Sequence, residues 1–185
     1  YLNENGDHKT HELIWMAPVS IQPVAPGAPK EPGNHFALVV LRMPIGITDF
    51  RECLANMHER MERIKSSDEA LVTFGLQRGI ANAPSPLAVG LTNYFANKAV
   101  GVLTNVPGPR APMTLAGTEV DGVLGWAPCS GDQPMTICIF SYNGKVTVGF
   151  GADKALVPDL NRLSELFYQG FQDMYAEIVE GASPR

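Results

Sequence analysis

The chain has 185 residues, of which 45% are hydrophobic and 18% are charged, a balance typical of a folded globular domain and unlike that of disordered chains. Its formal net charge is −5 and its basic residues are scattered among acidic ones, which argues against electrostatic binding of nucleic acid. Three cysteines without a CxxC pair argue against a disulfide framework or a zinc site and indicate a reducing, cytoplasmic compartment.

The first part of the chain predicts two strands separated by a loop. Residues 1–11 are polar, and we interpret them as a connector from sequence upstream. Leu13 to Gln22 predicts a strand interrupted by Pro18, which places this strand at a sheet edge or a bulge. Pro23 to Pro32 contains four prolines and predicts a loop. The apolar, β-branched run His35 to Met43 predicts a buried strand.

Three helices are predicted next. Thr48 is the expected N-cap of the first. Its apolar residues recur at helical spacing on one face: Phe50, Leu54, Met57, Met61 and Ile64. A second helix is expected from Asp68 to Ile80. A third follows Pro84 or Pro86 and ends near Asn97, because proline suits the first turn of a helix.

The pattern then changes to strands and a last helix. Ala99 to Thr104 predicts a short apolar strand, and weaker strand predictions cover Met113 to Ala116 and Val120 to Trp126. Met135 to Tyr142 and Lys145 to Phe150 predict a hairpin, because Asn143-Gly144 between them is a strong turn signal. A helix starting at Pro158 is expected to stop at Gly181, and residues 182–185 are expected to form a tail.

Helices are grouped in the middle and at the end of the chain, and do not alternate with strands. We therefore predict one domain over residues 1–185, of the α+β class, with a mixed β-sheet flanked by helices.

The usual catalytic and binding patterns do not occur. His8 and His11 have no third metal ligand nearby. Gly149 to Gly151 does not continue as a GxGxxG fingerprint or a P-loop. Cys129 has no assignable partner base. The residues alone therefore predict no metal site and no catalytic residue.

One rigid loop is predicted at the end of a strand. Pro107-Gly108 suits the two central positions of a type II turn. Asn105 could cap this turn through its side chain, and Pro109 would stop any continuing ladder. Such a loop suits a substrate contact, and a merely structural turn is the alternative.

The Asn105 to Pro109 stretch resembles the Asn-Val-Pro-Gly-Pro segment in the C-terminal domain of the bacterial wax ester synthase/diacylglycerol acyltransferase family. Further segments resemble the same domain in the same order. These are Ala17 to Ser20 with Gly33-Asn34, Leu115 to Gly117, Ser141 to Gly144, and Ala152-Asp153 with Val157 to Leu160.

The resemblance implies half of a chloramphenicol acetyltransferase-like fold, in which two related halves enclose a substrate tunnel. The implied reaction transfers a fatty acyl group from acyl-CoA to a long-chain alcohol or diacylglycerol, and acyl-CoA is a substrate, so no cofactor is implied. The family's His-His-x-x-x-Asp-Gly motif belongs to the N-terminal half. It is absent here, because Ala116 and Gly117 precede Asp121-Gly122 at the histidine positions. We therefore expect the chain alone to be inactive.

Tunnel contacts carried over from the resemblance fall on six residues: Asn105, Pro107, Gly108, Ser141, Tyr142 and Asp153. Gly131 to Thr136 departs from the family, in which a Gly-x-Ala-Leu-Asn segment is common, and this departure concerns the acceptor side of the tunnel.

The resemblance also implies partners. These are the N-terminal catalytic half, acyl-CoA and the acceptor lipid. The chain is expected in the cytoplasm, with any membrane or lipid-droplet contact peripheral. An isolated half would expose the face that its partner covers, so we expect self-association or a second chain. The alternatives are a non-catalytic lipid- or partner-binding domain, or a condensation-type or polyketide-associated acyltransferase.

Overall fold

A computed structural model describes residues 1–21, 36–179 and 181 of the chain. The predicted loop Pro23 to Pro32, the Gly33-Asn34 pair and the tail 182–185 lie outside the described residues. A short 3₁₀ turn, Asn3–Asn5, opens the chain within the segment that we interpret as a connector.

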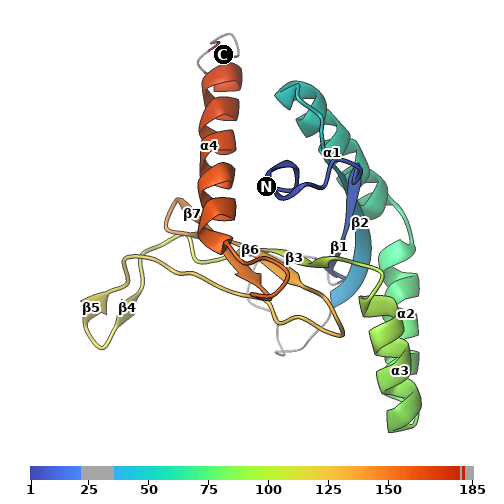
Figure 1. Cartoon of the computed structure of the whole chain (residues 1–185). Coiled ribbons are helices and arrows are strands. Elements are labelled where there is room, and N and C mark those ends of the chain that lie inside the picture. The colour runs from blue at the N-terminus through green and yellow to red at the C-terminus, as the bar shows by residue number, and fades with distance from the viewer. Residues whose placement is uncertain (22–35, 180, 182–185) are drawn as a thin grey trace.

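Five strands form one mixed sheet in the order β2-β1-β3-β6-β7 (Figure 1). The strands are β1 Glu12–Ser20, β2 Phe36–Pro44, β3 Gly101–Pro107, β6 Met135–Tyr142 and β7 Lys145–Ala152. The outer pairs, β1–β2 and β6–β7, are antiparallel, whereas β3 runs parallel to both β1 and β6. A two-stranded ribbon, β4 Thr114–Leu115 with β5 Thr118–Glu119, lies apart from this sheet.

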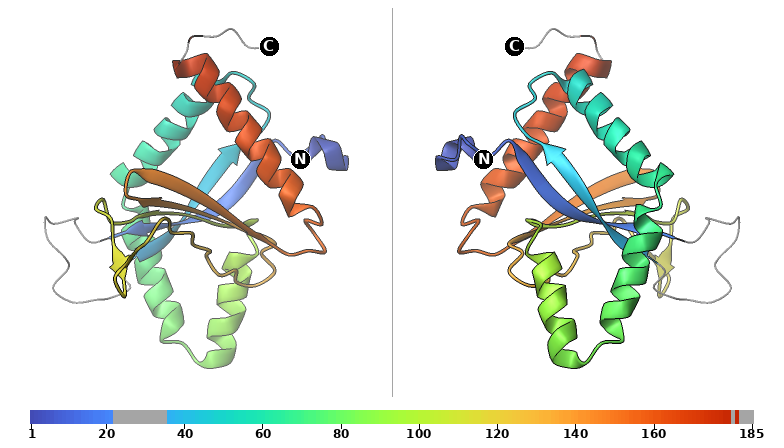
Figure 2. Two further views of the ribbon diagram at one scale, coloured as in Figure 1. Left: turned by 90° about the vertical axis from the view of Figure 1, so that its left-hand side faces the viewer. Right: turned by 90° about the vertical axis from the view of Figure 1, so that its right-hand side faces the viewer.

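Helices cover the two faces of the sheet in pairs. The helix α1, Phe50–Ser66, and the last helix α4, Leu160–Val179, lie on one face. The helices α2, Glu69–Ala81, and α3, Ser85–Ala96, extend from the other face (Figure 2). The predicted α+β class with a mixed sheet flanked by helices is therefore confirmed.

The core lies between the β1–β2 pair and α1. Trp15 and Ala17 of β1 alternate with exposed or half-buried neighbours and pair with Leu41 and Val39 of β2. Ile64 from the predicted apolar stripe of α1 completes this buried cluster. Burying a large aliphatic side chain contributes about 1.5–3 kcal/mol, so the alternation in β1 and β2 fixes which face of the sheet α1 covers.

The two first strands differ from the prediction in their place in the sheet. The strand with Pro18 is not at the edge, because β1 lies between β2 and β3. However, β3 pairs with β1 only at Trp15 and Met16, and Pro18 pairs only with Leu38 of β2. Pro18 has no backbone N–H, but β3 does not pair with β1 at this position, so no hydrogen bond between β1 and β3 is lost.

The edge strand next to β1 is β2, and the other edge of the sheet is β7. Strand β2 is buried on one face only. Helix α2 protects this edge, because its Gln77 and Glu69 side chains accept hydrogen bonds from the Leu38 and Val40 amides at 3.3 and 3.4 Å. Edge amides left unpaired would offer a template for aggregation.

Helix α1 begins one residue later than predicted. Its N-cap is Asp49 and not Thr48, because an Asp49 carboxylate oxygen accepts a hydrogen bond from the Glu52 amide at 2.9 Å. A carboxylate in this position also interacts favourably with the helix dipole. A threonine hydroxyl carries no charge and lacks this interaction.

The predicted hairpin after Met135 is confirmed. Asn143 and Gly144 both have positive φ, 46° and 76°, as a two-residue type I′ turn requires. The predicted strand Val120 to Trp126 is wrong, since this segment has no strand structure. It crosses the face of β6 and β7 instead, and its Val123 carbonyl accepts a bond from Thr147 Oγ1 at 2.6 Å.

Candidate functional site

Four of the six predicted site residues meet where β3 and β6 end. The two strands are parallel, so their carboxyl ends lie side by side, and Pro107 pairs with Ser141. The Gly108 amide donates to the Ser141 carbonyl at 2.9 Å and lies 3.3 Å from Ser141 Oγ. Asn105 belongs to the same strand end and pairs with Ile139.

The conformation of this stretch differs from the predicted turn. Gly108 does not have the positive φ that a type II turn requires. The pairing also continues past it, because the Pro109 carbonyl accepts a hydrogen bond from the Asn143 amide at 3.0 Å. Glycine is needed at 108 for a different reason, since a Cβ there would lie 2.2 Å from the Ser141 carbonyl oxygen.

Asn105 does not cap the loop. Its side chain is exposed, and within the described residues it makes no hydrogen bond to the chain. The amide group is therefore free to meet a ligand, which leaves its predicted role as a contact open.

Tyr142 and Asp153 have structural partners. The buried Tyr142 hydroxyl accepts a hydrogen bond from the Met113 amide at 2.7 Å and donates to the Val120 carbonyl at 2.9 Å. It thereby ties the β4–β5 ribbon to the sheet. Asp153 follows β7 at the opposite end of the sheet, and its carboxylate accepts a bond from the Ala155 amide at 2.8 Å. The structure therefore does not bring Asp153 together with the four residues at the ends of β3 and β6.

An apolar groove of about 470 Å³ lies between the sheet and the α2–α3 pair. Its lining comes from the sheet (Met16, Leu38, Val40, Val102), from α2 (Thr73, Leu76, Gln77, Ile80, Ala81), from α3 (Ala88, Thr92, Phe95, Ala96) and from the loop before β6 (Ser130, Gln133). None of the six predicted residues lines it. The sequence signal that could have indicated this groove is the unusually apolar composition of both helices.

The two side-chain amides of the groove wall, Gln77 and Gln133, are hydrogen-bonded within the chain. The buried Gln133 donates from Nε2 to the Ala96 carbonyl at 3.1 Å, and its Oε1 accepts from the Ser130 amide at 3.2 Å. Gln77 is bonded to the edge of β2. A buried polar group that is already paired does not need a ligand partner, so the groove is suited to an apolar ligand.

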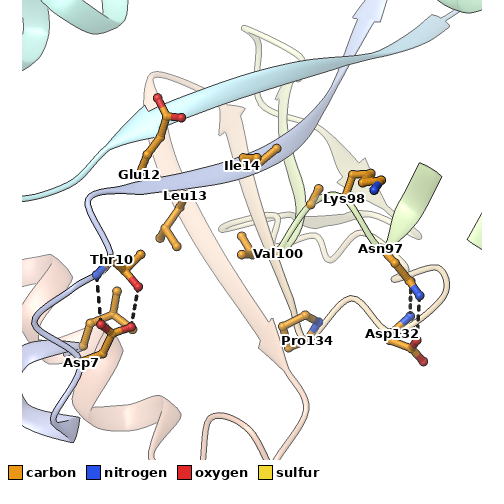
Figure 3. A pocket seen from close by; sticks show the side chains of 12 residues that line it. Asp7, Thr10, Glu12, Leu13, Ile14, Asn97, Lys98, Val100, Asp132 and Pro134 are labelled. Carbon is orange, nitrogen blue, oxygen red and sulfur yellow. Dashed lines mark hydrogen bonds between the residues drawn. The ribbon is translucent and has the colours of Figure 1, made fainter. Parts of the chain in front are cut away.

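A second, more open cleft of about 630 Å³ lies between the first residues, the start of β1 and the loops around Asn97 and Asp132 (Figure 3). Its carboxylates are paired within the chain. Asp7 accepts bonds from the Thr10 hydroxyl and amide, and the Thr10 hydroxyl is the main cause of its lowered pKa. Asp132 exchanges two bonds with Asn97, at 2.7 and 2.9 Å. The cleft therefore presents no unpaired carboxylate.

Neither a metal site nor an activated Cys129 thiol is seen in the described part of the chain. It contains no group of three His, Cys, Asp or Glu side chains that could hold a metal ion. Burial raises the pKa of the Cys129 thiol, which is the opposite of the shift that activates a nucleophilic cysteine.

The comparisons with known proteins decide the family. Residues 32–175 match the family described as the WS/DGAT C-terminal domain. This chain belongs to that family. The match covers the β2-to-α4 part of the fold and confirms the resemblance carried by the Asn105 to Pro109 stretch.

Relatives of the WS/DGAT family include proteins from bacteria and plants. A probable diacylglycerol O-acyltransferase of Mycobacterium tuberculosis is 26% identical over 171 residues, which is 90% of this chain and 36% of the relative. A wax ester synthase/diacylglycerol acyltransferase of Arabidopsis thaliana is 24% identical over 152 residues, covering 80% of this chain and 31% of the relative. The chain thus spans about a third of these relatives.

A solved structure confirms the fold. The wax ester synthase/diacylglycerol acyltransferase from Marinobacter aquaeolei VT8 superposes with a TM-score of 0.63 at 21% identity, covering 95% of this chain and 39% of that one. The predicted half-domain fold is therefore correct. No helix in the described residues is long and apolar enough to cross a membrane.

Proposed function

We propose that this chain is the C-terminal domain of an acyl-CoA-dependent O-acyltransferase that forms triacylglycerol or wax esters. The observation that carries the proposal is the match of residues 32–175 to the WS/DGAT C-terminal domain. The names of the relatives, diacylglycerol O-acyltransferase and wax ester synthase, support the same reaction class.

In this proposal the apolar groove holds a fatty acyl chain. Its volume of about 470 Å³ falls within the range of small-molecule sites. Transfer of each methylene from water into such a groove contributes about 0.8 kcal/mol. An acyl chain bound there would be held in place while its thioester reacts, which is the entropic advantage of a positioned substrate.

The strand-end cluster, which consists of Asn105, Pro107, Gly108 and Ser141 at the ends of β3 and β6, is proposed to contact the more polar parts of the substrates. Asn105 supplies a side-chain amide that is free within the described residues, and the Pro107-Gly108 backbone is held by its bond to Ser141. Tyr142 and Asp153 would act by holding the neighbouring loops, since their polar atoms are bonded to the backbone.

The catalytic base is proposed to come from an N-terminal half that carries the His-His-x-x-x-Asp-Gly motif. The aromatic face of α4 is suited to contact that half, because Phe167, Phe171 and Tyr175 are each 46% exposed. Exposed aromatic clusters of this kind mark protein interfaces.

A non-catalytic lipid-binding domain is the second candidate. It is favoured by one observation, which is that the groove lining contains no histidine, cysteine or carboxylate. This candidate predicts lipid binding without any ester formation, even when the chain is joined to a catalytic half.

The test is an ester-forming assay with palmitoyl-CoA and three acceptors: hexadecanol, dipalmitoylglycerol and hexadecylamine. We expect no product from the chain alone, and ester from the chain joined to a half with the histidine motif. Replacing the second histidine of that motif by alanine should lower the rate about 10²–10⁴-fold, as loss of a general base does. Ester formation by the chain alone would contradict the proposal, and amide formation alone would favour a condensation-type enzyme.

A further inference from the structure

The α2–α3 pair forms a helical hairpin that extends away from the sheet, on the side opposite α1 and α4 (Figure 2). Its loop, at residues 82–84, is the part farthest from the sheet. Between Glu69 and Ala96 the sequence contains only two charged residues, Glu69 itself and Arg78.

The outward sides of both hairpin helices are apolar. Val72 of α2 is 70% exposed and Val89 of α3 is 59% exposed, and Leu71, Leu87 and Tyr94 are exposed to a similar degree. An ordinary surface helix carries polar residues on its outer side. Helix α1 of the same chain follows that rule, since its exposed positions include three glutamates, two arginines and a lysine. The hairpin therefore presents an apolar surface that no other described part of the chain covers.

We propose that the α2–α3 hairpin docks onto a lipid surface. The exposed apolar residues are distributed over both helices of the hairpin, and the two helices are inclined to each other (Figure 2), so a protein that covered them would need a shape matched to both helices. A fluid acyl layer can surround both helices without a complementary shape. The near absence of charge suits such a layer, because each charged group placed among acyl chains is costly.

The dimensions of the hairpin fit shallow docking. Helix α2 has 13 residues, which corresponds to about 20 Å at 1.5 Å per residue. This length is well short of the roughly 30 Å hydrocarbon core of a bilayer, so the hairpin enters one leaflet or monolayer at most. The exposed Arg78 has a long side chain that can extend to the headgroups.

Polar and aromatic residues mark the boundary at the base of the hairpin. Tyr94 lies on the sheet-proximal turn of α3, and Lys98 follows the helix with its Nζ 4.7 Å from the centre of the Tyr94 ring. Tyrosine and lysine in this arrangement are typical of the interface between lipid and water.

The groove connects with this docking surface. Leu76 and Phe95 line the groove and are also 47% and 36% exposed. Docking would therefore bring the groove next to the lipid layer, so that an acyl chain or a lipid acceptor could pass between them without crossing water. This last step rests on the proposed function, whereas docking itself does not.

The test is flotation of the full chain with phosphatidylcholine vesicles. Changing both Val72→Asp and Val89→Asp should lower the vesicle-bound fraction at least about ten-fold, because aspartate is strongly disfavoured among acyl chains. The matched control changes Leu115→Asp and Val146→Asp, which are 75% and 66% exposed outside the hairpin, and should leave binding within about two-fold of the parent, as scattered surface apolar residues contribute little. Thermal unfolding of both variants should match the parent, since all four side chains are exposed.

Three results would overturn the proposal. These are absence of vesicle binding by the parent chain, unchanged binding by the hairpin variant, and an equal loss in the control variant. Binding by the chain alone that disappears when a catalytic half is joined would also overturn it, because the hairpin would then be a protein interface. Flotation involves no ester formation, so its outcome is independent of the proposed function.

Discussion

Gly108 is the position in the strand-end cluster where a side chain fits least. A Cβ at this position would lie 2.2 Å from the Ser141 carbonyl oxygen and 2.5 Å from Cε1 of Phe140. Both neighbours belong to β6, which is held between β3 and β7. The Ser141 carbonyl is part of the backbone and cannot move away without disturbing the ladder.

The change Gly108→Ala should therefore lower the free energy of unfolding by about 1–3 kcal/mol, the usual cost of overpacking. Urea denaturation followed by circular dichroism measures this change. Gly122→Ala is the matched control, because nothing lies within 4 Å of its added Cβ. Equal urea midpoints for the two variants would show that β6 can shift to accommodate the methyl group.

Gly108 also shows why local sequence preferences did not predict the conformation of this stretch. The Asn105 to Pro109 stretch was identified as important from its proline and glycine content, but its predicted turn is wrong. Local preferences describe a Pro-Gly pair in isolation, whereas here the backbone is set by pairing with Ser141, 33 residues away. Thr48 was misassigned as the cap because the adjacent Asp49 is a stronger N-cap residue, and its carboxylate accepts a hydrogen bond from the Glu52 amide.

At the level of elements, hydrophobic periodicity predicted most helices and strands. It failed for Val120 to Trp126. Alternating apolar residues show that one side of a segment is buried, but they do not show whether the segment pairs within a sheet or packs on the face of one. This segment lies against the sheet face, where Gly149 leaves room for the Gly125 carbonyl, 2.5 Å from where a Cβ would be. The groove was missed because α2 and α3 are apolar on more than one side, so no stripe indicates which side faces the sheet.

An ion-pair network joins β1, β2 and α1. Glu12 contacts Arg60 at 2.9 Å and Arg42 at 3.0 Å. The hydrogen bond from Arg60, followed by that from Arg42, lowers the pKa of Glu12 below its ordinary 4.5. A carboxylate whose pKa is lower in the folded state stabilises the fold above its unfolded pKa, and this stabilisation is lost as pH falls through the folded value.

The Tm of the parent chain should therefore fall by a few degrees as the pH falls below 4.5. The Glu12→Gln variant should not show this additional loss, since glutamine cannot be protonated. Differential scanning calorimetry at a series of pH values measures this. The control is Glu59→Gln, which removes an exposed carboxylate without an ion pair among the described residues and should keep the parent's pH dependence. Identical acid curves for the parent and Glu12→Gln would mean that the network does not stabilise the fold.

At the level of the whole molecule, the sheet separates two surfaces. The α1–α4 side carries the exposed aromatic residues of α4, which we propose contact an N-terminal catalytic half. The α2–α3 side carries the groove and the apolar hairpin (Figure 2). The family could be identified from ordered short motifs, but this division could not, because it depends on which face of one sheet each helix covers.

The central claim is that this chain supplies the wall of an acyl site, and it is tested most directly by filling the groove. Ala88→Trp places a large side chain in the groove from α3, and the control Ala55→Trp makes the same change at an exposed position of α1, outside the groove. The measurement is ester formation by the chain joined to a half with the histidine motif, with palmitoyl-CoA and with acetyl-CoA. We predict that Ala88→Trp lowers the palmitoyl rate at least about ten-fold, the effect of losing a few buried methylenes, with the acetyl rate and both rates of Ala55→Trp nearly unchanged. An equal effect of Ala88→Trp on both thioesters, or none on either, would contradict the claim.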